Sequence, residues 1–144
     1  MIQPSHPTTG SLPINDNVDV VRCRQTVRQI AAGLKFSIIS QTMLVTAASE
    51  LARNTLIHGG GGRFSWEVIS AGPRRGVRLS FEDDGPGIPD IQSAMTNGWT
   101  SGNGLGLGLP GAKRLANEFE IQSTVGRGTR VVITRWQHWP QQAL

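Results

Sequence analysis

Several features that would narrow the function of this chain are scarce or absent. Its 144 residues contain one cysteine, Cys23, so an internal disulfide is excluded, and the thiol falls in an apolar helical stripe that predicts burial rather than reactivity. No apolar run reaches the length of a membrane span, and the first residues lack a basic region followed by an apolar stretch. We therefore expect a globular, cytoplasmic protein without membrane contact.

Positive charge is present but is not concentrated. The formal net charge is +4 at pH 7, which favours an anionic partner, yet the arginines are dispersed and form no dense basic run. No DNA-binding motif accompanies them, so we expect no nucleic-acid partner. Nucleotide phosphates and an acidic protein are the expected anions, with a merely solvated surface as the alternative.

Apolar periodicity and capping residues outline the elements of the fold. Asp16 or Asn17 would cap a first helix, Ser37 a second, and Pro13 restricts the first strand to a sheet edge. The expected elements are a strand at 11–14, helices at 18–34 and 38–57, a hairpin of strands 63–70 and 77–82 about a turn at 71–76, a helix at 90–96, and a closing hairpin of strands 120–124 and 129–136. The expected core faces are Val20, Cys23, Val27, Ile30 and Leu34 in the first helix and Leu44, Ala47, Ala48, Leu51 and Thr55 in the second.

The first of two glycine-rich turns, DDGPGI at residues 83–88, follows the apolar alternation of the strand at 77–82. A carboxylate at Asp83 can accept a hydrogen bond from an exocyclic amine, as on adenine, and such a bond contributes roughly 1.5–3 kcal/mol, enough to select ATP over GTP. Gly85 and Gly87 would permit a sharp turn and the close approach of a flat ligand. Asp84 is expected to be solvated or to act on the site only through Asp83. The alternative for the whole segment is a solvated turn.

The second turn, GNGLGLGLPG at residues 102–111, leads into a segment in which Leu115 and Phe119 repeat at helical spacing. We therefore expect the glycines to open onto a helix N-terminus, where free backbone N–H groups favour phosphate. A P-loop is excluded because Ala112 separates the last glycine from Lys113 and no Ser or Thr follows the lysine. A dinucleotide fingerprint is excluded because residues 95–103 show no strand.

Glu50 and Asn54 lie one helical turn apart in the predicted helix 38–57, on a face that borders the core through Leu51. Taken alone, they are a satisfied pair on a helix surface. Together, ELARN at residues 50–54, Asp83-x-Gly85-x-Gly87 and Gly104-x-Gly106-x-Gly108 resemble the N, G1 and G2 boxes of the GHKL ATPase and kinase superfamily. The segments SELARN, EDxGPGIPD and GLGxGLPGxKRL and the closing Gly-Thr strand are similar to the RsbT-type switch kinases.

This resemblance implies a Bergerat fold: a two-layer α/β sandwich of a mixed, mostly antiparallel sheet with helices on one face, which also fits the predicted elements. The domain would span residues 11–136, with tails at 1–10 and 137–144. The resemblance implies ATP and Mg²⁺ as cofactors, Glu50 as catalytic base, Asn54 as Mg²⁺ ligand and Asp83 as the adenine-binding acid. The further nucleotide-binding residues would be Gly85, Gly87, Ile88, Gly104, Leu105, Gly106, Leu107 and Gly108.

Candidate contacts to phosphate or a partner are Arg53, Thr100, Ser101 and Lys113. An ordinary exposed helix arginine explains Arg53 equally well, and turn formation explains Thr100 and Ser101 equally well. Trp99, in the short ATP lid that the resemblance implies at residues 89–103, would anchor the lid to the core or contact a partner. The oligomeric state is not predicted.

The resemblance implies a serine/threonine kinase that phosphorylates a small STAS-domain antagonist and then activates another partner, such as a PP2C-type phosphatase. A nucleotide-gated, anti-sigma-like binding module is one alternative. A detached histidine-kinase catalytic domain is another, but His6, His58 and His138 are expected to be ordinary surface residues.

Overall fold

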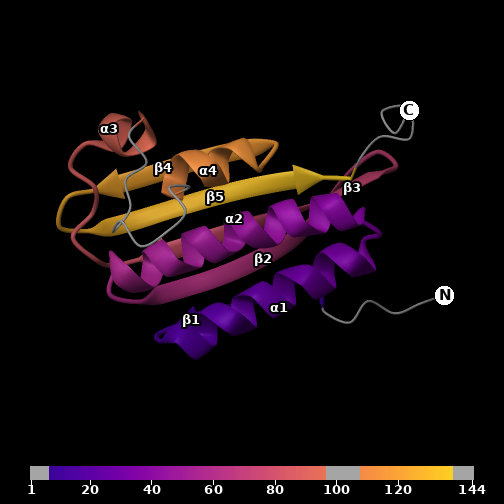
Figure 1. Cartoon of the computed structure of the whole chain (residues 1–144), viewed down its shortest axis with the longest axis horizontal. Coiled ribbons are helices and arrows are strands. Elements are labelled where there is room, and N and C mark those ends of the chain that lie inside the picture. The colour runs from indigo at the N-terminus through magenta and orange to yellow at the C-terminus, as the bar shows by residue number, and fades with distance from the viewer. Residues whose placement is uncertain (1–6, 97–107, 138–144) are drawn as a thin grey trace.

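The computed structural model of the chain describes residues 7–96 and 108–137 and arranges them in two layers, a sheet and the helices that cover one of its faces (Figure 1). The elements are β1 (Thr9–Ile14), α1 (Asn17–Gly33), α2 (Ile38–Ile57), β2 (Gly62–Ala71), β3 (Arg74–Asp83), α3 (Ile91–Thr96), α4 (Gly108–Arg114), β4 (Glu118–Thr124) and β5 (Gly128–Trp136). Within these residues, no helix combines the length and hydropathy that a membrane span needs.

The order of the strands brings together residues that are far apart in the chain. The strands run β1-β2-β3-β5-β4, and every described pairing is antiparallel. β3 therefore lies beside β5, with Asp83 opposite Thr129, although α3, α4 and β4 all intervene in the sequence. β1 is an edge strand, as Pro13 required, because the proline nitrogen has no hydrogen to donate to a second neighbour.

The core lies between the sheet and the two long helices. The predicted stripes of α1 and α2 are both buried, including Thr55, whose hydroxyl donates to the Leu51 carbonyl at 2.9 Å. From the sheet, Phe64 packs against Phe81 with ring centroids 5.2 Å apart. Burying one side chain of this size contributes about 1.5–3 kcal/mol, so the packing of α1 and α2 on the sheet is a major source of stability.

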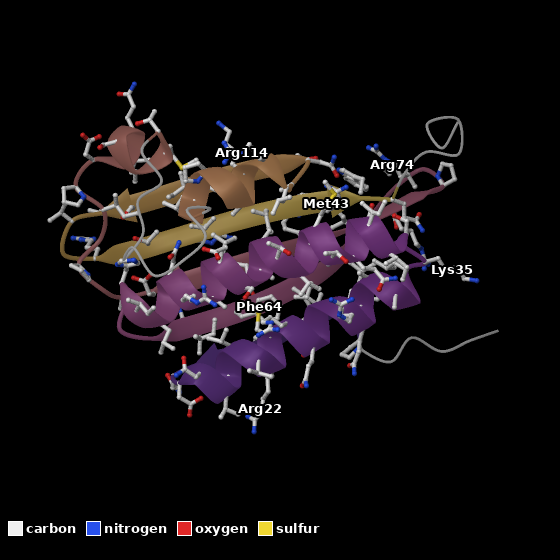
Figure 2. The ribbon with its side chains drawn as sticks, viewed as in Figure 1. Arg22, Lys35, Met43, Phe64, Arg74 and Arg114 are labelled. Carbon is white, nitrogen blue, oxygen red and sulfur yellow. The ribbon has the colours of Figure 1, made fainter. Side chains whose placement is uncertain are left out.

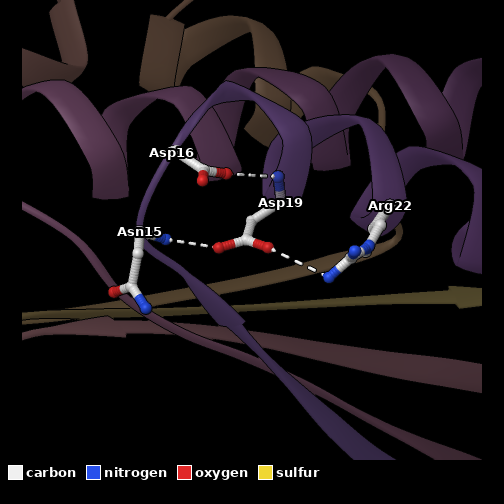
Figure 3. A network of polar contacts seen from close by, with 4 residues as sticks. All are labelled: Asn15, Asp16, Asp19 and Arg22. Carbon is white, nitrogen blue, oxygen red and sulfur yellow. Dashed lines mark hydrogen bonds and ion pairs between the residues drawn. The ribbon is translucent and has the colours of Figure 1, made fainter.

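The first helix begins at a reciprocal set of carboxylate hydrogen bonds, drawn in Figure 3. The Asp16 side chain accepts from the backbone N–H of Asp19 at 2.9 Å, and the Asp19 side chain accepts from the backbone N–H of Asn15 at 2.9 Å. Arg22 lies 3.5 Å from the Asp19 carboxylate, one turn further along. Asp16 is thus the cap, because its carboxylate satisfies one of the N–H groups that the first turn leaves free.

The second helix has the predicted bounds, 38–57, and the predicted cap. The Ser37 hydroxyl accepts from the backbone N–H of Ser40 at 3.1 Å. Beyond Ile57 the chain turns through His58 and glycines, of which Gly60 has a φ of +74°. This helix therefore runs the length of the sheet and presents Glu50 and Asn54 near its C-terminal end.

Apart from the buried Arg135, the described basic residues lie on the surface and come from several elements. Figure 2 shows Arg22, Lys35 and Arg114 pointing outward from separate parts of the molecule. On the sheet face away from the helices, cross-strand pairs join Arg63 and Arg130 to Glu82, and Arg78 to Glu67. Exposed pairs of this kind contribute about 0–1 kcal/mol each, so this face is held mainly by its backbone ladder.

Two expected boundaries are wrong near the first strands. β1 begins at Thr9 rather than residue 11, because Gly10 packs directly under the ring of Trp66, and the Trp66 indole donates to the Pro7 carbonyl at 3.1 Å. The expected tail at 1–10 therefore overlaps the sheet. The β2–β3 turn is only Gly72-Pro73, since Gly72 takes the positive φ of +61° that the first position of a type II′ loop requires.

The expected continuation of the last helix to Phe119 is also wrong. α4 ends at Arg114, and Phe119 belongs to β4, opposite Ile133. The helix ends where the buried guanidinium of Arg135 donates to the Leu115 carbonyl at 2.9 Å, and burial lowers the pKa of this arginine. The four-residue spacing of Leu115 and Phe119 therefore spans a helix end and a strand start.

We predict that two glycines of the β4–β5 turn differ in their tolerance of a side chain. Gly126 and Gly128 both have positive φ, of 82° and 112°, but a Cβ at Gly126 meets open space, whereas one at Gly128 would lie 2.0 Å from the Asp83 carbonyl. Gly126→Ala should cost about 1 kcal/mol of unfolding free energy and Gly128→Ala at least about 3 kcal/mol. Urea denaturation measures both, and equal losses would contradict the close approach.

We also predict that Cys23 is unreactive in the folded protein. Its side chain is fully buried, and burial raises the pKa of the thiol to about 12. The thiolate is the reactive form, so a thiol-specific reagent at pH 8 should label the protein only after a denaturant unfolds it. Rapid stoichiometric labelling without denaturant would show that this helix does not pack as described.

Candidate functional site

A cavity of about 110 Å³ opens where the C-terminal part of α2 meets the end of β3 and the start of β5. Asp83, Ile88 and Asn54, which the sequence analysis placed in a nucleotide site, all line it together with Gly87. The remaining wall is formed by Leu51, Thr55, His58, Phe81, Pro86, Leu109, Thr129 and Val131. The cavity is thus mainly apolar with a few polar groups, as expected of a small-molecule site.

Asp83 is the acidic group of this cavity. Its carboxylate accepts the backbone N–H of Gly85 at 2.9 Å and that of Thr129 across the strand pair. Burial raises the pKa of Asp83, and the neighbouring Asp84 adds to this, while the two backbone hydrogen bonds and His58 act in the opposite direction. The carboxylate is therefore oriented by the backbone and keeps lone pairs for a ligand. Asp84 itself is exposed, as predicted.

His58 belongs to the cavity and is not an ordinary surface residue, which corrects the expectation from the sequence. It follows Asn54 by four residues at the end of α2, so both side chains project from the same face. Burial lowers the pKa of His58, against the opposing effect of the Asp83 charge. The i, i+4 spacing from Asn54 was the signal that would have found it.

The two glycines of the first turn are needed mainly for packing. A Cβ on Gly85 would lie 2.7 Å from the Gly59 carbonyl oxygen, and one on Gly87, whose φ is +76°, would lie 2.4 Å from the Thr124 carbonyl oxygen. Gly85 does not line the cavity. The sequence analysis expected a ligand to approach Gly85 closely. In the structure, the segment that approaches Gly85 is that of Gly59 in the same chain.

The turn is anchored to the β4–β5 hairpin by two hydrogen bonds that sequence reasoning missed. Gly126 donates its backbone N–H to the Pro86 carbonyl at 2.9 Å, and Ile88 donates its own to the Ser123 hydroxyl at 2.7 Å. The Ser123 hydroxyl also lies 2.8 Å from that of Thr129. Neither Ser123 nor Thr129 carries a local sequence signal, since both act through strand pairing.

The polar face of α2 has one satisfied and one unsatisfied group. Glu50 is 8% exposed, does not line the cavity, and has its Oε1 atom 3.6 Å from Nη1 of the exposed Arg53. The Nδ2 atom of Asn54 is buried and has no hydrogen-bond partner among the described residues. An unsatisfied buried amide costs about 1–3 kcal/mol, so this side chain is suited to a polar ligand.

The remaining predicted residues lie beside the cavity or outside the described residues. Gly108 is the buried first residue of α4, and the next residue, Leu109, reaches the cavity. Lys113 is exposed in the last turn of α4 and is not part of the cavity wall. The predictions for Trp99, Thr100, Ser101, Gly104, Leu105, Gly106 and Leu107 fall outside the described residues.

A metal ion in this site would need ligands other than carboxylate side chains. Residues 7–96 and 108–137 contain no group of three or more His, Cys, Asp or Glu side chains that could hold one. The Asn54 amide is a suitable donor, because Mg²⁺ accepts one or two protein oxygens and completes its coordination with phosphates and water. Its Nδ2 atom, which is buried and has no hydrogen-bond partner among the described residues, carries N–H donors and would bind a phosphate oxygen rather than the metal.

Comparison with known proteins agrees with this geometry. A family model described as histidine kinase-, DNA gyrase B-, and HSP90-like ATPase matches residues 39–138. The serine/threonine-protein kinase RsbT of Bacillus subtilis (strain 168) is 42% identical over 118 residues, covering 82% of this chain and 89% of that protein. The anti-sigma F factor of Thermoanaerobacter sp. (strain X514) is 32% identical over 118 residues, covering 78% and 82%.

The chain therefore belongs to the histidine kinase-, DNA gyrase B- and HSP90-like ATPases, the GHKL superfamily, and within it to the RsbT-type kinases. The family and the fold class predicted from the three sequence boxes are both confirmed. The strands, predicted as a mixed and mostly antiparallel sheet, are antiparallel in every described pairing.

If Asp83 binds an adenine amine, as the sequence predicts, lowering the pH should weaken binding. The loss should begin at a higher pH than the protonation of an ordinary aspartate would cause. Burial raises the Asp83 pKa above 3.8, so protonation removes the acceptor sooner as the pH falls. Titration calorimetry with adenosine, which has no titrating phosphate, should show affinity falling as the pH is lowered from neutral into the acid range in which an ordinary aspartate is still ionised.

Two variants separate the groups in that experiment. Asp83→Asn should bind adenosine weakly at every pH, because the titrating carboxylate is gone. His58→Gln should retain the decline, because His58 modifies the Asp83 pKa only as a smaller, opposing effect. A wild-type affinity that stays constant over this range would contradict a role for the Asp83 carboxylate in adenine binding.

Proposed function

We propose that this protein binds ATP with Mg²⁺ in the described cavity and transfers the γ-phosphoryl group to a serine or threonine of a STAS-domain protein. The observation that carries the proposal is the placement of three groups by α2 and β3. Glu50 and Asn54 lie one turn apart on α2, and Asn54 shares a cavity wall with Asp83. A base, an amide donor and an amine acceptor thus follow one another in the order that ATP would require.

The adenine ring would occupy the apolar cavity. Ile88 and Leu109 provide flat apolar contact, and the Asp83 carboxylate would accept from the exocyclic amine. A guanine carbonyl at the same position would face this carboxylate and be repelled. The cavity would therefore favour adenine nucleotides through one hydrogen bond whose geometry the backbone of Gly85 already holds.

The phosphates would extend from this cavity along α2. Asn54 would hold Mg²⁺ through its side-chain oxygen, and a bound Mg²⁺ would neutralise phosphate charge during transfer. Gly104, Gly106 and Gly108, with the intervening Leu105 and Leu107, remain the predicted phosphate-binding segment that precedes α4. The approach of α4 to α2, through Leu109 at the cavity, supports this path.

Glu50 would act as the base at the phosphate end. Its carboxylate takes the proton of the serine or threonine hydroxyl while the hydroxyl oxygen forms the new bond to the γ-phosphorus and the bond to ADP breaks. Arg53, 3.6 Å from the Glu50 carboxylate, orients it through an i, i+3 ion pair. The exposed side of Arg53 also leaves it accessible to an acidic partner.

The partner chemistry rests on the relatives. One is named serine/threonine-protein kinase RsbT and several are named anti-sigma F factors, which supports a protein that alternates between partners. We infer that the substrate is a STAS-domain antagonist and that its phosphorylation releases the kinase to a downstream regulator such as a PP2C-type phosphatase. The anti-sigma relatives also favour a second candidate, a nucleotide-gated binding module in which catalysis is not obligatory.

The test compares phosphotransfer with nucleotide binding in matched variants. Purified protein, Mg²⁺ and γ-labelled ATP are incubated with a STAS-domain protein encoded near this gene. Glu50→Gln should slow transfer at least about 100-fold, the usual contribution of a general base, while the ATP dissociation constant changes little. Glu120→Gln, an exposed acid on β4, is the control and should retain full activity. Asp83→Asn should lose both binding and transfer.

Three outcomes separate the candidates. Acid-stable label on a serine or threonine that disappears in Glu50→Gln supports the kinase. Retained transfer by Glu50→Gln would refute the assigned mechanism. Tight ATP binding with no label on any STAS-domain protein would favour the binding module, and acid-labile label would indicate phosphohistidine instead.

A further inference from the structure

One serine outside the cavity connects two of the segments that line it. Ser123 lies on β4, does not line the cavity, and places its hydroxyl within hydrogen-bond distance of three groups. These are the backbone N–H of Ile88 at 2.7 Å, the carbonyl of Gly128 at 3.2 Å and the hydroxyl of Thr129 at 2.8 Å. Ile88 and Thr129 are themselves cavity residues on opposite segments.

The hydrogens of this cluster can be counted. The Ile88 N–H can only donate and the Gly128 carbonyl can only accept, so Ser123 accepts from the first and gives its single hydrogen to the second. The Thr129 hydroxyl must then donate to Ser123 for all three contacts to be hydrogen bonds at once. Its only hydrogen is thereby used, so the hydroxyl of Thr129, a residue of the cavity wall, can then only accept.

Thr129 stands next to Asp83 in the cavity wall. The two residues are paired across β3 and β5, and the Thr129 backbone N–H donates to the Asp83 carboxylate. A threonine hydroxyl that is restricted to accepting would add a second acceptor to the cavity wall that carries this carboxylate. Two adjacent acceptors match a ligand group that carries hydrogens, and both oppose a carbonyl oxygen in the same position.

We propose that Ser123 is a positioning residue that sets the hydrogen-bond polarity of the cavity and so strengthens its selection of a 6-aminopurine over a 6-oxopurine. Ser123 acts through Thr129 and Ile88 and does not touch the ligand. This inference rests on the proposed function, because it requires that the cavity binds the base of a nucleotide.

The test uses ADP and IDP, whose bases differ at the 6-position, where one carries an amine and the other a carbonyl. Dissociation constants are measured by titration calorimetry for the wild type, Ser123→Ala and Ser123→Thr. Loss of the Ser123 hydroxyl frees the Thr129 hydrogen, so Ser123→Ala should weaken ADP binding roughly five- to tenfold and IDP binding less than about twofold. Ser123→Thr keeps a hydroxyl and should keep the wild-type preference.

A matched control separates polarity from stability. Ser80 lies on β3 opposite Val132, on the sheet face away from the cavity, so Ser80→Ala should alter neither dissociation constant. A purely structural role for Ser123 would weaken ADP and IDP binding equally, and that result, or an unchanged preference in Ser123→Ala, would overturn the inference. If Ser123→Ala does not fold, Thr129→Val removes the acceptor that Ser123 is proposed to fix, and an unchanged preference there would overturn the inference equally.

The failure of this inference differs from a failure of the proposed function. Wild-type protein that binds neither ADP nor IDP refutes nucleotide binding before any variant is made. Wild-type protein that prefers ADP, with the same preference in Ser123→Ala and Thr129→Val, leaves nucleotide binding intact and refutes the role of Ser123 alone.

Discussion

The site depends on how closely the start of β5 approaches the end of β3. Gly128 has no side chain and a φ of +112°, which allows the strands to pair where a Cβ would lie 2.0 Å from the Asp83 carbonyl. This approach places the backbone N–H of Thr129 on the Asp83 carboxylate, while Gly85 supplies a second N–H from the turn. The acid is therefore oriented by the backbone before a ligand arrives, which is the arrangement that selective binding requires.

The same region carries groups that stability alone would not favour. Burial opposes the charged forms of both Asp83 and His58, and a buried Asn54 nitrogen lacks a partner among the described residues. These costs are offset by the core between the sheet and the helices α1 and α2, part of which, including Leu51 and Phe81, also forms the apolar wall of the cavity. Unsatisfied polar groups on a well-packed scaffold are typical of a functional site, since a ligand completes their contacts.

Elements with strong local signals could be predicted closely, and contacts between distant segments could not. Ser37 and the apolar spacing of α2 set its bounds because capping and periodicity act within a few residues. Ser123 and Thr129 were missed because their roles arise from strand pairing, whereas His58 was missed although its i, i+4 spacing from Asn54 is a local signal. Phe119 was misplaced because four-residue spacing also occurs where a helix ends and a strand begins.

The sequence by itself determined the family, the two long helices and the hairpins. It also identified four residues that meet in the cavity, Asn54, Asp83, Gly87 and Ile88. These could be found because sequence boxes, helix caps and apolar periods are local patterns. Only the tertiary structure decided why Gly85 must lack a side chain, that Arg53 pairs with Glu50, and that Ser123 joins the two cavity walls. The physical reason is that each of these depends on distances between atoms of separate segments, or on which rotamer packing selects, and neither is encoded in residue spacing.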